Sequence, residues 1–112
     1  MKTVDKIYES IVTNISTVIN GEWVKAKLDI EVIGEMVSFT GNYLNNKNET
    51  KQIDVDEFDF QLTFDVLELH KITTEGGNNK WNRAVFSVQP DGAFDMEFIW
   101  DQELQDEIER LA

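Results

Sequence analysis

Most of the side chains in this sequence that could take part in chemistry are carboxylates. The 112 residues include 22 Asp and Glu, one histidine (His70) and no cysteine. Without cysteine there are no disulfides, iron–sulfur clusters, thiolate zinc sites or cysteine nucleophiles. One histidine could complete a Ser-His-Asp arrangement, but a multi-histidine metal site is excluded. His70 falls late in a predicted helix, where a cation is favourable, so we interpret it as structural.

The carboxylates form no recognisable catalytic or metal-binding motif. Residues 54–59 resemble the start of a calcium loop, but Asp59 stands where an EF-hand loop needs glycine and Asp65 where it needs glutamate. No spacing singles out two carboxylates for acid–base catalysis. Gly76-Gly77 is interpreted as a helix stop, and there is no glycine-rich phosphate loop. We therefore expect no enzymatic activity, no metal and no cofactor.

Charge is the strongest compositional signal. The formal net charge is −12, and residues 52–112 alone carry −11. Such a surface repels nucleic acid and membranes and attracts basic proteins. The alternative is that the acidity only promotes solubility. A hydrophobic fraction of 41% argues against a disordered acidic tail. No apolar run approaches 18 residues and the N-terminus lacks a signal-peptide pattern, so we expect a soluble, cytoplasmic protein.

The first half of the chain predicts a helix and a hairpin. Residues 4–19 place their apolar side chains on a 3.6-residue period. Residues 23–44 alternate as two strands, and Gly34-Glu35 fits a two-residue type II′ turn. This turn pairs Ile33 with Met36, and the same register stacks the apolar residues of both strands on one face.

The middle of the chain is predicted to lead into a second helix. Residues 45–52 read as a polar loop and residues 53–55 as a short edge strand. Residues 56–74 follow a helical period with Asp56 as N-cap, although the alternation over residues 58–62 also fits a strand. The expected apolar row is flanked by Phe60, Phe64, Leu67 and Ile72.

The last third predicts a second hairpin and a short helix. Pro90-Asp91-Gly92 fits a three-residue loop with a bulge, which pairs Gln89 with Ala93. On one face, that register sets Val88 opposite Phe94, Phe86 opposite Met96 and Ala84 opposite Phe98. Residues 102–111 then form a helix with Asp101 as N-cap.

These elements predict one domain over residues 1–112. Their order is α-β-β-α-β-β-α, and each hairpin has one apolar face and one polar face. The simplest arrangement is an antiparallel β-sheet built from the two hairpins and covered on one face by helices, which is an α+β fold.

The polar face of the second hairpin predicts a docking surface for a basic protein. Between Asp95 and Glu109 there are seven carboxylates and no basic residue, and such like charges repel each other. Trp81 falls in the outward register as a potential anchor. The alternative is a solvated polar face. The candidate binding residues are Asp95, Glu97, Asp101, Glu103 and Trp81, joined by Asp56, Glu57 and Asp59 at the start of the second helix.

The C-terminal half resembles the YezG-like bacterial immunity proteins, which are antitoxins. The residues that carry the resemblance are Trp81, Phe86, Val88, Asp91-Gly92, Phe94, Phe98 and Trp100-Asp101. An N-terminal helix ending near Glu22-Trp23, followed by a hairpin and an acidic helix, is also similar to that family. The resemblance implies a small, acidic, non-enzymatic α+β protein that neutralises a secreted or contact-delivered toxin, often a nuclease. This chain has Ala93 where a lysine often follows the glycine, so the class of toxin stays open.

The resemblance and the composition agree on one leading hypothesis. Nuclease toxins must bind polyanions, so they are usually basic around the active site. An acidic partner is steered to such a surface and associates quickly. We therefore expect an immunity protein whose partner is a toxin domain. The alternatives are an acidic adaptor or secretion chaperone for a basic protein, and a small hydrolase that uses carboxylates and His70.

Overall fold

The computed structural model describes residues 3–75 and 80–111, which form a five-stranded antiparallel sheet and three α-helices. The strand order is β3-β2-β1-β4-β5, so β5 and β3 are the two edges. The elements are α1 (Val4–Val18), β1 (Trp23–Ile33), β2 (Met36–Asn45), β3 (Thr50–Gln52), the 3₁₀ turn η1 (Val55–Glu57), α2 (Gln61–Thr74), β4 (Arg83–Val88), β5 (Phe94–Ile99) and α3 (Gln102–Leu111).

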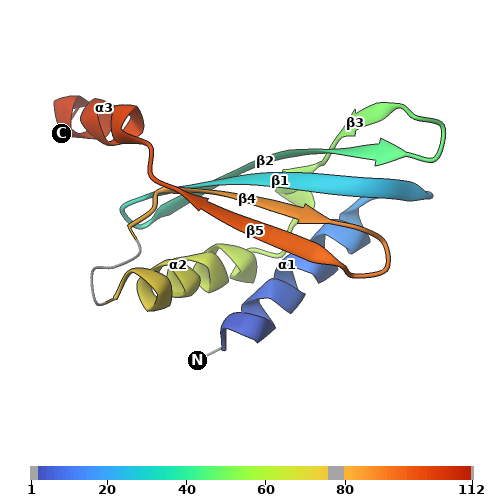
Figure 1. Cartoon of the computed structure of the whole chain (residues 1–112), viewed down its shortest axis with the longest axis horizontal. Coiled ribbons are helices and arrows are strands. Elements are labelled where there is room, and N and C mark those ends of the chain that lie inside the picture. Colours follow the sequence, from blue (N-terminus) through green and yellow to red (C-terminus); the bar gives the residue numbers. More distant parts are fainter. Residues whose placement is uncertain (1–2, 76–79, 112) are drawn as a thin grey trace.

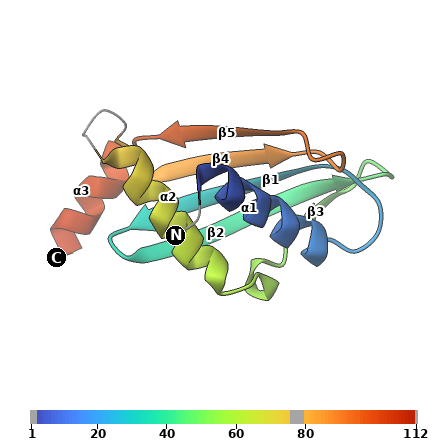
Figure 2. The same cartoon turned by 90° about the horizontal axis from the view of Figure 1, so that it is seen from below.

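Helices α1 and α2 cover one face of the sheet and leave the other face open (Figures 1 and 2). The helix α1 begins at a Thr3 cap, whose side chain accepts a hydrogen bond from the Lys6 backbone N–H, and it buries Ile7, Ile11 and Ile15. These residues recur every four positions, so they share the stripe that meets the sheet. The predicted α+β fold with one helix-covered face is therefore confirmed.

Both predicted hairpin registers are confirmed. Ile33 pairs with Met36 around Gly34, whose φ of +61° is the left-handed value that the first position of a type II′ turn requires. In the second hairpin the Gln89 N–H donates to the Ala93 carbonyl at 2.9 Å, and Gly92 has a φ of +89°. The apolar pairs of that hairpin are Val88 with Phe94, Phe86 with Met96 and Ala84 with Phe98.

The middle of the chain differs from the sequence prediction. The edge strand is Thr50–Gln52, three residues earlier than expected, while Ile53 turns inward and is buried. The helix α2 begins at Gln61 rather than at Asp56, which lies in η1. The N-cap residue is Phe60, whose side chain makes no capping hydrogen bond, and the Asp59 side chain just before it accepts a hydrogen bond from the Gln61 N–H at 3.0 Å. The expected stop at residues 76–79 lies outside the described residues, and α2 itself ends at Thr74.

The helix α3 is present as predicted but does not join the helical layer. Figure 1 shows α3 beyond the strand ends, away from α1 and α2. None of its described residues is buried, and Leu111 is exposed. Among the helices that the structure describes, none is long and apolar enough to cross a membrane.

Candidate protein-binding surface

Asp95 and Glu97 lie side by side on the open face of the edge strand β5. Both are exposed, and their cross-strand partners on β4 are the neutral residues Ser87 and Val85. No described cationic side chain forms an ion pair with either carboxylate. Two cations that precede β5 are engaged elsewhere, because Arg83 pairs with other carboxylates and Lys80 lies over the Trp100 ring at 4.0 Å. This pair of carboxylates is therefore available to a cationic partner.

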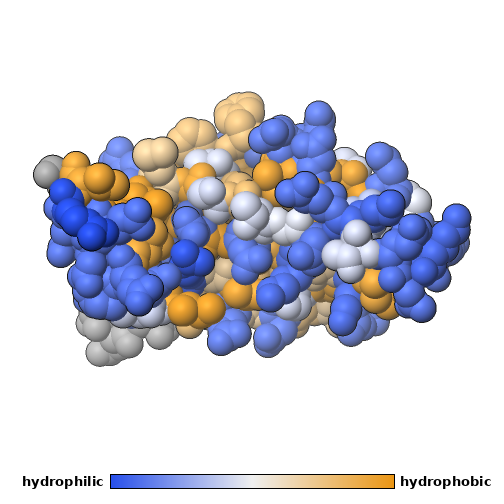
Figure 3. Space-filling view, turned by 90° about the horizontal axis from the view of Figure 1, so that it is seen from above, coloured by the Kyte–Doolittle hydropathy of each residue, from blue (hydrophilic) through white to orange (hydrophobic). Residues whose placement is uncertain are grey.

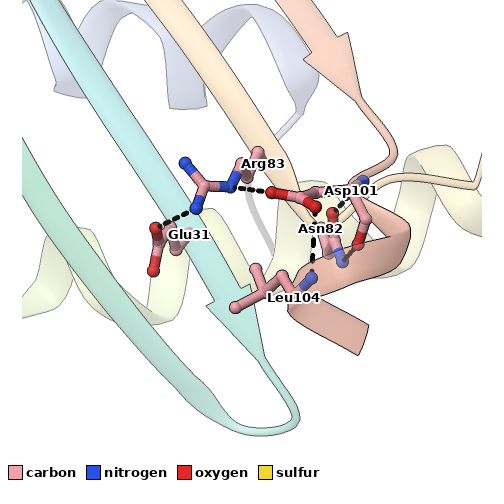
Figure 4. A network of polar contacts seen from close by, with 5 residues as sticks. All are labelled: Glu31, Asn82, Arg83, Asp101 and Leu104. Atoms are coloured by element: carbon pink, nitrogen blue, oxygen red, sulfur yellow. Dashed lines mark hydrogen bonds and ion pairs between the residues drawn. The ribbon is translucent and has the colours of Figure 1, made fainter. Parts of the chain in front are cut away.

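Unlike Asp95 and Glu97, Asp101 forms a helix-capping hydrogen bond and an ion pair within the protein. One of its carboxylate oxygens accepts a hydrogen bond from the Leu104 N–H at 3.1 Å, which confirms the predicted helix cap. The other oxygen lies 2.8 Å from Nε of Arg83, and Nη2 of Arg83 lies 2.9 Å from Glu31 Oε1. Figure 4 shows this chain of contacts from β1 through β4 to the start of α3. The charge of Asp101 is thus partly neutralised within the protein.

Asn82 joins the end of β5 to the start of α3. Its side-chain Nδ2 donates to the Asp101 carbonyl at 2.9 Å, and its Oδ1 accepts from the Asp101 N–H at 2.8 Å (Figure 4). Asn82 is buried, so these two hydrogen bonds replace contacts with water. They fix the direction in which α3 leaves the sheet, and with it the exposed carboxylate of Glu103 in the first turn.

The predicted acidic residues divide into two separate groups. Asp95, Glu97, Asp101 and Glu103 belong to β5 and the start of α3. Asp56 and Glu57 lie in η1, which contacts β2 toward the opposite edge of the sheet, and Asp59 lies just before α2. Because β2 and β5 are separated by β1 and β4, the structure does not bring the two groups together.

Trp81 is buried, so the prediction of an outward anchor is wrong. Its relative exposure is 1%. The ring packs on His70 and Phe98, with ring centroids 4.7 and 4.8 Å away, and Nε1 donates to Thr73 Oγ1 at 2.8 Å. Trp81 precedes the first residue of β4, so it does not follow that strand's alternation and turns under the C-terminal end of α2 instead.

His70 holds this part of the chain in place. Its Nε2 lies 2.8 Å from the Trp81 carbonyl, and because a carbonyl only accepts, Nε2 donates. The structural interpretation of this histidine is consistent with that contact. In the described part of the chain, no three His, Asp or Glu side chains are grouped to hold a metal ion.

The exposed aromatic residues are the feature that sequence reasoning missed. Phe60 and Phe64 were expected beside the core row, yet they are 78% and 55% exposed. Phe94, at the start of β5, is 47% exposed. A sequence signal for the first two was the i, i+4, i+7 spacing of Leu62, Val66 and Leu69, because the stripe that these three residues form is buried in α2 and leaves Phe60 and Phe64 outside it.

The open face also has a cationic end. Figure 3 shows this face, where hydrophilic residues predominate and hydrophobic ones are scattered. A shallow hollow of about 610 Å³ is lined by Lys25 and Lys27 of β1, Asn42, Ser87 and Asp95, among others. Lys27, Ser87 and Asp95 stand in one cross-strand row. The backbones of Lys27 and Asp95 are roughly 10 Å apart across β4, because neighbouring strands are about 4.8 Å apart, and the two side chains form no ion pair in the described part of the chain.

One titratable group beneath β5 is perturbed. Burial raises the pKa of the Tyr8 hydroxyl above its ordinary value of 10.0, and the nearby charge of Asp5 raises the pKa further. The Tyr8 ring packs on Phe94, with centroids 5.2 Å apart. Tyr8 is therefore part of the packing that supports β5 rather than a group placed for acid–base catalysis.

In comparisons with known proteins, no protein-family model matches this chain and no curated protein is significantly similar to it.

Proposed function

We propose that this protein is an immunity protein that binds and neutralises a basic toxin domain, most simply a nuclease, in the cell that makes the toxin. The observation that carries the proposal is the pair Asp95 and Glu97, exposed on β5 and without an ion pair to any described cation. Carboxylates held together without counter-charges destabilise a fold by mutual repulsion. A basic partner relieves that repulsion, so the charge favours complex formation.

The proposed mechanism is inhibition by surface binding, without catalysis by this chain. The net charge of −12 attracts a basic domain from a distance, and the attraction raises the association rate. Asp95 and Glu97 then meet Lys or Arg side chains that would otherwise hold nucleic acid phosphates. The cytoplasm is the proposed location, because the toxin must be met before it reaches its substrate.

The proposal predicts that a basic toxin domain is encoded next to this protein's gene, and that domain is the partner for the binding test. Asp95→Asn/Glu97→Gln should keep the fold, because neither side chain has a described partner, and should weaken toxin binding at least tenfold. Tenfold corresponds to about 1.4 kcal/mol, a modest value for two charges at an interface. The association rate of the unmodified protein should also fall steeply as salt rises, while dissociation changes less.

A matched variant separates the two acidic groups. Asp56→Asn/Glu57→Gln removes the same charge from η1 and should weaken binding less than threefold. Equal losses in both variants would mean that net charge alone attracts the toxin. Full protection of cells by Asp95→Asn/Glu97→Gln would place the docking surface elsewhere. If the adjacent toxin domain does not bind at all, the proposed function is wrong.

A further inference from the structure

The outer edge of β5 presents unpaired backbone groups. In an antiparallel sheet each residue points its N–H and C=O to one side only. The Gln89–Ala93 hydrogen bond and the register of β4 with β5 show that the backbone N–H and C=O of Asp95, Glu97 and Ile99 point toward β4. The backbone N–H and C=O of Phe94, Met96 and Phe98 therefore point away from the sheet. These three residues can form hydrogen bonds with a further strand.

No described element covers this edge. Figure 1 shows β5 at the near side of the sheet, and Figure 2, turned by 90°, shows it again as the outermost strand. Natural proteins usually block such an edge with a very short strand, a bulge, proline or a covering loop. The strand β5 runs for six residues, and its register with β4 is continuous. Its one protective feature is the charge of Asp95 and Glu97.

The two sides of the edge have different chemistry. On the helix side, Phe94 is about half exposed and stacks on Phe86 at 5.2 Å, and Met96 and Phe98 are half-buried in the same row. On the open side, Asp95 and Glu97 stand between these positions. An added strand places its own side chains alternately on the same two sides, about 5 Å from their neighbours. It therefore meets an apolar row on one side and carboxylates on the other.

We propose that β5 binds an extended segment of the toxin by strand addition, and that this segment alternates basic and apolar residues. The inference rests on the proposed function and names its mode of binding. Backbone hydrogen bonds to Phe94, Met96 and Phe98 supply affinity, as in other cases where a peptide extends a sheet. Lys or Arg opposite Asp95 and Glu97, with apolar residues over Phe94 and Met96, supply specificity.

The same geometry disfavours a second copy of this chain as the occupant. Any pairing of β5 with β5 in register puts Asp95 and Glu97 of one copy against the carboxylates of the other. Like charges directly opposite each other destabilise a strand pair. A basic strand gains from the same two side chains, so the charge selects between the two occupants.

The first test uses a synthetic peptide, so it does not depend on the toxin. The probe is acetyl-Val-Lys-Val-Lys-Val-Lys-amide added to the full-length protein labelled with ¹⁵N. We expect the amide protons of Phe94, Met96 and Phe98 to exchange with solvent at least fivefold more slowly with peptide. The amides of Asp95 and Glu97, already bonded to β4, should change little. Protection without this alternation, or no protection, would overturn strand addition.

Three peptide controls separate strand addition from simple charge attraction. A Val-Glu peptide of the same length should not bind, and a peptide with three Val followed by three Lys should bind at least fivefold more weakly. A Val-Lys peptide with alternate N-methyl groups loses the donors that face β5 and leaves the protein unchanged. If the block or N-methylated peptides bind as well as the parent, charge alone explains binding and the proposal is overturned.

A pair of variants tests the protein side. Met96→Pro removes an outward N–H, a position where an edge strand tolerates proline, and Met96→Ala keeps that N–H while shortening the same side chain. The dissociation constant of the Val-Lys peptide should rise at least fivefold more in Met96→Pro than in Met96→Ala, with folding checked by thermal unfolding. Equal effects would contradict the proposal. If Met96→Pro does not fold, the N-methylated peptide decides the same question.

The outcome for strand addition can be distinguished from the outcome for the proposed function. A toxin domain that binds through Asp95 and Glu97 without protecting the Phe94, Met96 and Phe98 amides supports the function and overturns strand addition. A peptide that binds as expected, together with an adjacent toxin domain that does not bind, supports strand addition and overturns the function. Protection of the three amides in the free protein, with dimers in sedimentation, would show that a second copy occupies the edge.

Discussion

The two edges of the sheet are built in opposite ways. On one edge, β3 pairs with only three residues of β2, and the Ile53 N–H then donates to the Gly41 carbonyl at 3.0 Å. Beyond that point Phe58 packs edge-on against Phe39, with centroids 5.6 Å apart. On the other edge, β5 is paired along its whole inner side and has no described cover outside. The chain thus covers part of one edge, here called the closed edge, whereas the six-residue edge of β5 has no described cover.

This contrast shows how an open edge can be kept from self-association without being blocked. A covered edge cannot bind any strand, whereas an edge protected by charge rejects like-charged strands and still accepts basic ones. Asp95 and Glu97 have that role on β5. Substitutions at the two edges and at the groups that support them should therefore have different effects.

Gly41 should be essential to the closed edge. A Cβ at this position would lie 2.6 Å from the Lys27 carbonyl oxygen and 3.1 Å from Ile53 Cδ1, so the backbone of β1 would have to move. Gly41→Ala should lower the free energy of unfolding by about 3 kcal/mol, at the upper end for overpacking. Urea denaturation measures the loss. Ser38→Ala on the same strand is exposed and should stay within about 0.5 kcal/mol of the unmodified protein.

The junction between the open edge and α3 should depend on Asn82. Asn82→Ala removes both hydrogen bonds to Asp101 and leaves its backbone groups unpaired, at a cost of about 2 kcal/mol. Amide exchange in residues 102–111 should accelerate more than in β1. The exposed Asn42→Ala serves as the control, with an expected change within about 0.5 kcal/mol. Unchanged exchange in α3 would show that other contacts hold it.

Removing the charge from β5 should make the open edge self-associate. In Asp95→Thr/Glu97→Thr the facing carboxylates disappear, and at about 0.2–1 kcal/mol for each like-charged pair the dimer should strengthen about tenfold. Analytical ultracentrifugation over a range of concentrations measures this change. Asp54→Thr/Asp56→Thr removes two charges near the closed edge and should leave the dimer dissociation constant unchanged. Equal association of both variants would mean that net charge, not the edge, controls assembly.

Tyr8 should give the smallest effect, visible only at alkaline pH. Its pKa is raised in the folded protein, so folding favours the protonated phenol. That contribution is complete below pH 10, the ordinary value, and is lost as the pH rises through the raised pKa. Tyr8→Phe should therefore lose less stability than the unmodified protein above pH 10, with equal pH dependence between pH 7 and 9. Chemical denaturation across this range makes the comparison.

The hairpins could be predicted because two local signals agree. Gly34-Glu35 and Pro90-Asp91-Gly92 each specify a loop length, and the apolar alternation on either side accepts only one register for that length. The exposure of Asp95 and Glu97 followed from the register of the second hairpin. These parts of the candidate surface depend on contacts between residues near each other in the sequence.

The helical layer was harder to predict because its details depend on distant contacts. The start of α2 is shifted because the Asp59 N–H donates to Asn14 Oδ1 of α1 at 2.8 Å, an interaction across 45 positions. Distant contacts also explain why the outward position predicted for Trp81 is wrong. This residue is buried by α2 and by Phe98 of β5, which are far from it in the sequence or on another element. Exposure of Phe60 and Phe64 likewise depends on which face of α2 meets α1 and the sheet.

The sequence alone determined the registers of the two hairpins, the fold class, the cap at Asp101 and the acidic face of β5, because turn geometry and alternation act over a few residues. The tertiary structure alone decided that β5 is an edge, that Asp101 is tied to Arg83 and Asn82, and that the η1 carboxylates lie toward the opposite edge of the sheet. The order of strands in a sheet is set by which apolar faces pack together across the whole chain, and no local pattern encodes that order. The outward direction of the backbone N–H and C=O of Phe94, Met96 and Phe98 follows from the local register. That no described strand pairs with them follows only from the strand order.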